Sequence, residues 1–255
     1  MAFMNCRMRS KELKKEVEIN VILPVESGAP KRVLYLLHGL AGDASSWMRR
    51  SSIERYATAR DLAVIMPDGG RSYYTDAVHG AERYWSYISE ELPEFVHTIF
   101  KLPQGREKTF VAGLSMGGYG ALKLGLRHPE RFAAAGALSA VADIRLRIAS
   151  EESAERRMEF RQIFGGVSRL AADGNDLFVL AADAMKSGAK LPKIISFCGT
   201  DDRLLANNRR FTAHLERLKY PGFHYYERPG RHNWDFWDAH IPEVLDFLVS
   251  GKLPE

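Results

Sequence analysis

One short segment of the 255-residue chain has the residue types and spacing of an activated alcohol nucleophile. The segment is Gly113-Leu-Ser-Met-Gly117, with Ser115 between two glycines. An apolar, strand-like run leads into it, and a helix-compatible run from Tyr119 to Arg127 follows. A serine on such a strand–turn–helix junction is held in a strained backbone conformation, and only glycines leave room for the neighbouring chain. The sequence therefore predicts that Ser115 attacks a carbonyl carbon.

A serine hydroxyl needs a base to accept its proton, and the base needs an orienting carboxylate. Where the serine sits on a turn of this kind, the acid and then the histidine follow it along the chain. Downstream of the long charged segment after Ser115 there are four histidines: His214, His224, His232 and His240. Three of them fall within helical or strand patterns, whereas His232 lies in a loop just beyond a strand. We therefore expect His232 to be the base.

The acid is expected after the preceding strand, where the sequence reads Cys198-Gly-Thr-Asp-Asp-Arg-Leu-Leu205. Both Asp201 and Asp202 stand in that loop, and position alone does not choose between them. The acid would hold one ring nitrogen of His232 protonated and stabilise the imidazolium formed during attack.

Negative charge develops on the carbonyl oxygen during attack, so N–H donors must already point at it. One donor is expected to be the backbone amide of Met116, the residue after the nucleophile. We assign the other to the amide of Leu40, in the loop His38-Gly-Leu-Ala-Gly42 that follows the strand Arg32–Leu37. Glycines let this loop turn toward the serine, and His38 is expected to have a structural role.

Strand-like and helical runs alternate along the chain, and several strand candidates are short and continuously apolar. This pattern predicts a doubly wound, mostly parallel α/β sheet with helices on both faces. The expected strands are Val17–Leu23, Arg32–Leu37, Leu62–Met66, Thr109–Leu114, Ala133–Leu138, Lys193–Cys198 and Phe223–Glu227. The expected amphipathic helices are Ser86–Phe100, Leu204–Leu218 and Trp234–Val249. Pro93 should kink the first of these helices or mark a restart after one turn.

A segment of about fifty residues, between the strand ending near Ala140 and the strand starting at Lys193, is far longer than an ordinary connection. It contains the charged, helical run Ile144–Phe164 and a second short helix at Asp176–Lys186. We interpret it as a helical insertion before the acid-bearing strand, approximately residues 144–190, without a core of its own. Because no linker or repeat is visible, residues 1–255 are expected to form a single domain.

The composition indicates a globular protein and excludes several other classes. Apolar residues make up 45% and charged residues 27% of the chain, close to globular averages. The net charge of +4 is spread thinly among interleaved acids and bases, so we expect no nucleic-acid partner. No apolar run approaches the ~20 residues of a membrane span, and the N-terminus lacks a signal core, so we expect a cytoplasmic protein without a membrane partner. Cys6 and Cys198 have no metal-ligand spacing around them, so no metal is expected.

Together these residues resemble the esterase D-like branch of the α/β-hydrolases, and most of all its small intracellular tributyrin esterases. The branch also includes S-formylglutathione hydrolases, feruloyl and acetylxylan esterases, and the antigen 85 mycolyltransferases. The resemblance covers essentially the whole chain through LLHGLAGDASSW (36–47), MPDGGRSYYTD (66–76), YWSYISEELPEFV (84–96), GLSMGGYGAL (113–122), CGTDDRLL (198–205) and GRHNWDFW (230–237). The family pattern places a glycine three residues before its acid, so Gly199 implies that Asp202 is the acid. The segment Arg145–Arg161 matches no pattern of the branch, so the resemblance implies nothing about pocket shape.

The resemblance implies an α/β-hydrolase fold and a serine carboxylesterase that acts on short-chain acyl esters through an acyl-enzyme on Ser115. The resemblance implies that the protein needs no cofactor and that its partner is a small-molecule ester substrate. Thioester hydrolysis of the S-formylglutathione type and feruloyl or acetylxylan ester hydrolysis are alternatives, followed by acyl transfer and by a non-catalytic binding module. Among aromatic loop residues, Tyr74 and Trp85 are expected to bind substrate. Association into a homo-oligomer is compatible with the sequence.

Overall fold

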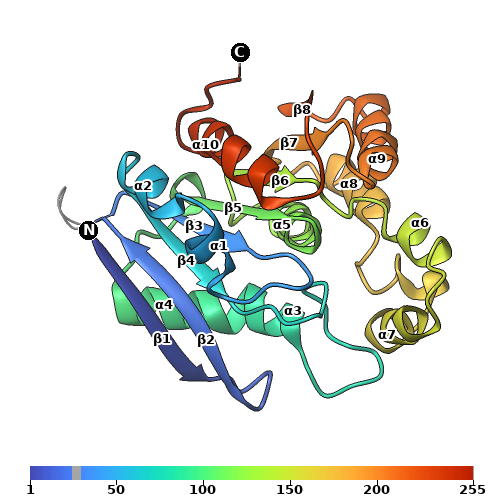
Figure 1. Ribbon diagram of the computed structural model, residues 1–255, viewed down its shortest axis with the longest axis horizontal. Helices are drawn as coiled ribbons and strands as arrows, with labels where there is room; N and C mark the ends of the chain where they lie inside the picture. Colours follow the sequence, from blue (N-terminus) through green and yellow to red (C-terminus); the bar gives the residue numbers. More distant parts are fainter. Residues whose placement is uncertain (25–29, 255) are drawn as a thin grey trace.

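The computed structural model describes residues 1–24 and 30–254, which build an eight-stranded sheet between two layers of helices (Figure 1). The strand order is β1-β2-β4-β3-β5-β6-β7-β8. The pairs β1–β2 and β2–β4 are antiparallel, and the remaining neighbours are parallel. The strands are β1 (Ala2–Arg9), β2 (Glu16–Leu23), β3 (Arg32–Leu37), β4 (Leu62–Pro67), β5 (Thr109–Leu114), β6 (Ala134–Leu138), β7 (Lys193–Gly199) and β8 (Phe223–Arg228).

All seven strands expected from the sequence are present, with ends that differ by no more than one residue. The expected mostly parallel α/β sheet is therefore confirmed. β1 is an additional strand that the sequence did not indicate. Its inward side chains include Met4, Cys6 and Met8, which are only partly buried and are not typical strand formers. Because β1 pairs with β2, the strand expected at Val17–Leu23 is second in the sheet.

The carboxyl ends of the central parallel strands meet at one edge of the sheet. Leu37 at the end of β3 pairs with Gly113 of β5, and Leu114 pairs with Leu138 at the end of β6. Every residue of β4, β5 and β6 is buried, because helices cover both faces of the sheet. The loops that follow β3, β5, β7 and β8 therefore open onto the same edge.

Helices cover the two faces in separate groups (Figure 1). The helices that cover them include α2 (Ile53–Thr58), α4 (Leu92–Phe100), α5 (Met116–Arg127), α8 (Leu177–Lys186), α9 (Leu205–Arg217) and α10 (Trp234–Ser250). α2 and α10 share a hydrophobic core with Leu34 and Phe110. α4, α5, α8 and α9 share the larger core with Tyr35 and Val111, on the opposite face. The side chains of successive residues in one strand thus point into different cores, because they alternate between the two faces of the sheet.

The first amphipathic helix expected from the sequence is interrupted near Pro93. It consists of α3 (Tyr84–Ser86), a π-helical turn (Tyr87–Glu91) and then α4. Pro93 is the second residue of α4, which directly follows this π-helical turn. The backbone is right-handed helical at Glu91 and Leu92, so the helix does not restart at Pro93; a π-helical turn precedes the proline within a continuous helical path.

The long connection between β6 and β7 forms α6 (Ile144–Ala149), α7 (Ala154–Phe164) and α8 beside the sheet (Figure 1). Phe160 and Phe164 of α7 belong to the same hydrophobic core as α5. The buried side-chain nitrogen of Lys123, on α5, donates to the Asn175 side-chain oxygen at 2.7 Å and to the Tyr74 carbonyl at 3.0 Å. These contacts tie the insertion to the helix that follows Ser115.

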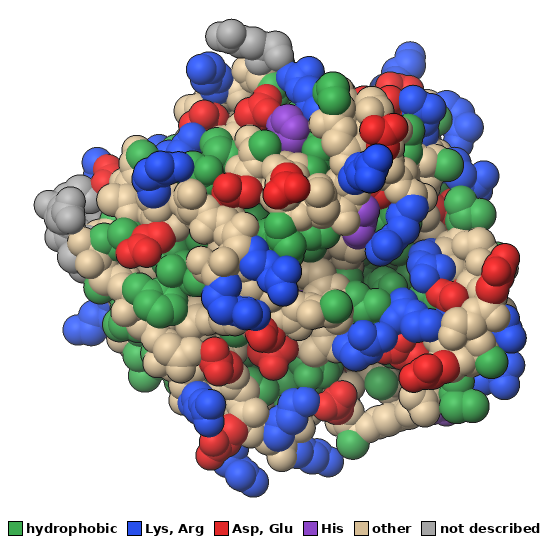
Figure 2. Space-filling view, in the orientation of Figure 1, with side chains coloured by type: hydrophobic (Ala, Val, Ile, Leu, Met, Phe, Trp, Pro, Cys, Tyr) green, Lys and Arg blue, Asp and Glu red, His purple; other side chains and the backbone are tan. Residues whose placement is uncertain are grey.

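Figure 2 shows basic and acidic side chains intermixed over the viewed face, as the interleaved charges of the sequence indicate. The buried apolar side chains gather in the two cores on either side of the sheet. Within residues 1–24 and 30–254, no helix combines the length and the apolar character that crossing a bilayer requires.

Candidate active site

Ser115 occupies the sharp turn between β5 and α5, at the carboxyl edge of the sheet. Its backbone has φ 53° and ψ −114°, a strained conformation for a residue with a side chain. A Cβ on Gly113 would lie 2.4 Å from the Gly117 carbonyl oxygen, and a Cβ on Gly117 would lie 2.3 Å from the Leu37 carbonyl oxygen. Both glycines are therefore required for the chain to pass the turn that presents Ser115.

His232 and Asp202 lie next to this serine, although they are distant from it in the chain. Asp202 follows β7, and His232 follows β8. The Nε2 atom of His232 lies 3.0 Å from Ser115 Oγ, and its Nδ1 lies 3.0 and 2.9 Å from the two carboxylate oxygens of Asp202. Because Nδ1 faces a carboxylate, it carries the ring proton, and Nε2 is left to accept from the serine hydroxyl. The arrangement allows proton transfer from Ser115 to His232.

Of the two candidate acids, Asp202 is the one that faces the histidine. Asp202 is buried, whereas Asp201 is exposed and its amide donates to the Gly230 carbonyl. The loop after β7 passes close to the loop that carries His232, since a Cβ on Gly199 would lie 2.4 Å from the same Gly230 oxygen. A residue with a side chain would not fit at position 199, which explains sterically why a glycine stands three residues before Asp202.

The surroundings of Asp202 favour its charged form. Burial raises the pKa of this carboxyl, but hydrogen bonds from His232, the Leu204 amide and the Ser139 hydroxyl outweigh it, so the pKa lies below its ordinary value. Ser139 follows β6 with φ 49° and accepts a hydrogen bond of 3.1 Å from Trp237 Nε1. Ser139 and Trp237 were not expected from the sequence. A serine directly after an apolar strand that ends at this edge is the signal that points to Ser139.

Leu40 and Met116 both lie beside Ser115. Leu40 lines the same pocket as Ser115, and Met116 is the first residue of α5. Neither of their backbone amides has a hydrogen-bond acceptor within the described residues. The N-terminus of α5 adds its partial positive charge at this point. Two amides available beside a nucleophile are suited to bind the oxygen on which negative charge develops.

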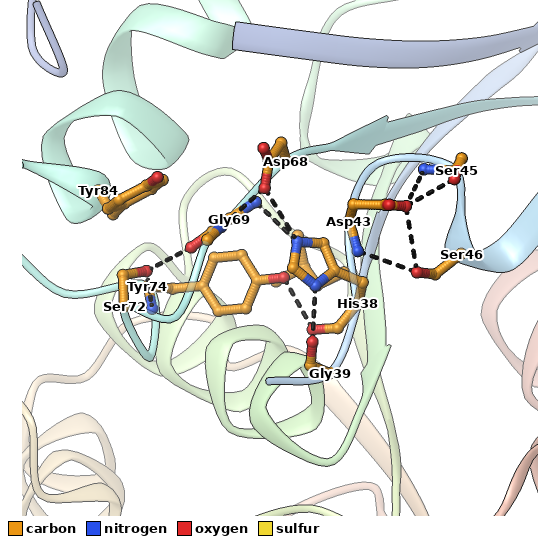
Figure 3. Close-up of polar contacts among 12 residues, drawn as sticks. His38, Gly39, Asp43, Ser45, Ser46, Asp68, Gly69, Ser72, Tyr74 and Tyr84 are labelled. Carbon is orange, nitrogen blue, oxygen red and sulfur yellow. Dashed lines mark hydrogen bonds and ion pairs between the residues drawn. The ribbon is translucent and has the colours of Figure 1, made fainter. Parts of the chain in front are cut away.

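The buried imidazole of His38 holds the loop that carries Leu40 (Figure 3). Its Nδ1 lies 2.7 Å from the Gly39 carbonyl oxygen, and its Nε2 lies 2.8 Å from the Gly69 amide nitrogen. Because Nε2 accepts from Gly69, the ring proton is on Nδ1 and is donated to Gly39. A carboxylate oxygen of Asp68 is farther from Nε2, at 3.5 Å. These contacts agree with the structural role expected for His38.

A pocket with a volume of about 420 Å³, in the range of small-molecule sites, contains Ser115 and His232. One wall is aromatic and includes Trp234 and Trp237. The rings of these two residues pack edge to face, with centroids 5.3 Å apart. In the part of the chain that the structure describes, no group of three His, Cys, Asp or Glu side chains is arranged to hold a metal ion.

Tyr74 and Trp85 lie outside this pocket, contrary to the expectation that they bind substrate there. Tyr74 is fully buried, and its hydroxyl donates to the His38 carbonyl at 2.9 Å (Figure 3). Trp85 stacks on His128, and the Arg127 guanidinium lies 4.1 Å from the centre of its ring. Both rings pack against α5 or the residue that follows it, so they contribute to the packing of the protein and not to the pocket.

Fold and site together define a class of protein. A mostly parallel sheet carries a serine on a strand–turn–helix junction, and an acid and a histidine reach that serine from the loops after later strands. This is the architecture of the α/β-hydrolases.

Comparisons with known proteins identify the family within this class. The Esterase family model matches residues 10–248, so the chain belongs to that family. An acetyl esterase of Caldicellulosiruptor saccharolyticus is 34% identical over 97% of this chain and 98% of its own. Two structures from Staphylococcus aureus are each 33% identical and cover 98% of this chain: fluorophosphonate-binding serine hydrolase F (98% of its own chain, TM-score 0.89) and an S-formylglutathione hydrolase (99%, TM-score 0.86). The chain is thus a serine hydrolase that acts on carboxylic ester bonds.

Proposed function

We propose that this esterase hydrolyses esters of short acyl groups, from acetyl to butyryl. Ser115 is the nucleophile, His232 the general base and acid, and Asp202 the orienting carboxylate. The observation that carries the proposal is the unbroken set of hydrogen bonds from Ser115 through His232 to Asp202. Similarity to an acetyl esterase along nearly the whole chain supports the short acyl group.

In the first half of the reaction, Ser115 Oγ attacks the ester carbonyl carbon while His232 Nε2 takes the hydroxyl proton. The amides of Leu40 and Met116 hold the negative charge on the former carbonyl oxygen. His232 then gives its proton to the leaving alcohol, and the acyl group stays bonded to Ser115.

In the second half, a water molecule takes the place of the alcohol. His232 accepts a proton from this water as it attacks the acyl carbonyl, and then returns the proton to Ser115 Oγ. The carboxylic acid leaves, and the imidazole has regained its starting state. One histidine thus serves both halves, with Asp202 stabilising the imidazolium each time it forms.

A second candidate substrate class is the thioester. The 33% identity to an S-formylglutathione hydrolase favours it, and the same acyl-enzyme chemistry applies with a thiolate as leaving group. Turnover of an acetyl thioester and an acetyl oxyester by the same enzyme preparation separates the two classes. A kcat/KM ratio well above one in favour of the thioester would assign the chain to that class.

The variant Ser115→Ala tests the assignment of the nucleophile. It should lower hydrolysis of p-nitrophenyl acetate by at least about a thousandfold while the circular dichroism spectrum stays unchanged. Ser150→Ala, at an exposed serine on the insertion, is the matched control and should keep the wild-type rate. Near-normal turnover by Ser115→Ala would show that another group is the nucleophile.

A further inference from the structure

Two arginine side chains line the pocket that contains Ser115 and His232. They come from separate elements: Arg50 ends α1 (Ser46–Arg50), and Arg203 stands in the loop between β7 and α9. Both are exposed, and neither forms an ion pair with a carboxylate of the described residues. Arg49, the neighbour of Arg50, differs in this respect because it pairs with Asp43 at 3.5 Å. The pocket therefore presents two guanidinium groups that remain available to a ligand.

The aromatic wall of the pocket holds one of these cations in place. The Arg50 guanidinium lies 6.0 Å from the centre of the Trp234 ring, within reach of a cation–π attraction. Trp234 in turn packs edge to face against Trp47 and Trp237, with centroids 5.2 and 5.3 Å away. A ring face attracts the guanidinium without neutralising its charge, so Arg50 keeps its capacity to bind an anion.

The acidic side chains of the neighbouring loops do not cancel these charges inside the pocket. Asp43, Asp201, Asp202 and Asp235 stand on those loops, but none of them lines the pocket, and Asp202 faces the ring of His232. Asp43 accepts hydrogen bonds from two nearby serines besides its pairing with Arg49, and Asp235 accepts from Asn233 at 3.1 Å. Among the described residues that line the pocket there is no Asp or Glu, so a bound substrate meets two positive charges and no carboxylate.

We propose that this pocket selects esters that carry a carboxylate a few bonds away from the reacting carbonyl, with Arg50 and Arg203 as specificity-determining residues. The inference rests on the proposed function, because it takes Ser115 in the same pocket as the nucleophile. A guanidinium binds a carboxylate through two parallel N–H···O bonds, which gives direction as well as charge attraction. Two such groups at one pocket also raise the local concentration of an anionic substrate.

Two matched pairs of substrates test the proposal and locate the carboxylate. p-Nitrophenyl hemisuccinate and p-nitrophenyl butyrate have four-carbon acyl groups with and without the charge. 3-Acetoxybenzoate and its methyl ester carry the same difference on the leaving group. For each pair, the ratio of kcat/KM for the anionic ester to that for the neutral ester is measured in the wild type and in the double variant Arg50→Gln, Arg203→Gln. A ratio taken within one preparation does not depend on the folded fraction.

We expect the double variant to lower this ratio about tenfold in at least one pair, the size of effect that one or two exposed charge-assisted contacts supply. Raising the ionic strength from about 0.05 to about 0.5 M should shrink the wild-type preference, because salt screens exposed charges. Arg49→Gln is the matched control, since it removes an adjacent positive charge that does not line the pocket. It should leave both ratios unchanged.

A change below about threefold in both pairs, the range of an exposed charge without a specific contact, overturns the proposal. An equal change in Arg49→Gln also overturns it, because the effect then belongs to the general field and not to the pocket. A change confined to the hemisuccinate pair places the carboxylate on the acyl group, and one confined to the acetoxybenzoate pair places it on the leaving group. Failure of the proposed function itself looks different: the neutral esters are then not turned over, or Ser115→Ala turns them over as fast as the wild type.

Discussion

Replacing His38 by alanine should weaken the fold and slow the chemical step, and the two effects have separate causes. The side chain is 1% exposed, and its ring nitrogens bind the Gly39 carbonyl and the Gly69 amide. The variant leaves the buried Gly69 amide without a partner, at about 1–3 kcal/mol, and removes the packing of the ring; the Gly39 carbonyl loses one of its two donors and keeps the Gly42 amide. The free energy of unfolding should therefore fall by roughly 3–5 kcal/mol.

The slower reaction follows from the position of the ring beneath the loop that carries Leu40. If the Leu40 amide no longer points at the developing oxyanion, the loss is at most that of one donor, about 3–4 kcal/mol in the transition state. We expect kcat for p-nitrophenyl acetate to fall between about tenfold and a few hundredfold. KM should change little, because the full negative charge on this oxygen exists only near the transition state.

Urea unfolding followed by tryptophan fluorescence measures the first effect, and steady-state kinetics without urea measure the second. His38→Asn is the matched control: its amide nitrogen takes the place of Nδ1 and donates to Gly39, but the side chain is too short to reach Gly69. It should recover part of the stability and part of kcat. If His38→Ala loses stability yet keeps kcat within about threefold of the wild type, His38 supports the fold alone and the link to the Leu40 amide is refuted.

Asp202→Asn should lower kcat for p-nitrophenyl acetate by about 10⁴-fold with little change in KM, because an amide favours the wrong tautomer of His232; a loss below about tenfold would contradict this. Although burial raises the pKa of Asp202, hydrogen bonds bring it below the ordinary value, so the carboxylate stabilises the fold above the unfolded-state pKa of about 3.9. The difference in free energy of unfolding between wild type and Asp202→Asn should shrink as the pH falls below about 4, as measured by urea titrations at several pH values. Lys123→Met leaves the acceptors of its side-chain nitrogen, among them Asn175 and the Tyr74 carbonyl, without their donor and should cost roughly 2–4 kcal/mol in the same assay. An unchanged urea midpoint for Lys123→Met would mean that burying the polar group costs as much as its hydrogen bonds contribute.

The order of Ser115, Asp202 and His232 along the chain is what makes their meeting predictable. Each follows a parallel strand, and the carboxyl ends of such strands share one edge of the sheet. Order alone does not separate Asp201 from Asp202. In the structure Gly199, the last residue of β7, lies against the Gly230 carbonyl, and Asp202 is the aspartate of the following loop that faces His232.

β1 and the pocket residues are less predictable, for two different reasons. The inward side chains of β1 are only partly buried at the edge of the sheet, so its apolar pattern is weak. Tyr74 illustrates the second reason: an aromatic residue in a loop indicates burial without indicating what buries it. Its ring packs where a Cβ on Gly120 would stand, 2.5 Å from the nearest ring atom, and Gly120 belongs to a helix far along the chain. A contact between residues so far apart in the chain produces no regular spacing that could be recognised in the sequence.

Lys123 shows the same limit for a charged residue. A lysine in a helix suggests an exposed face, yet every residue of α5 up to Leu126 is buried, and the acceptors of Lys123 come from two separate loops. Chemistry is predictable here because it depends on which strand a residue follows. The proposed selectivity depends on Arg50, at the end of α1, and Arg203, in a loop, and these two elements meet only in the folded chain. Members of a family that share the same three catalytic residues can therefore differ in the esters they select, and the charge on the pocket wall is where this chain should show its own preference.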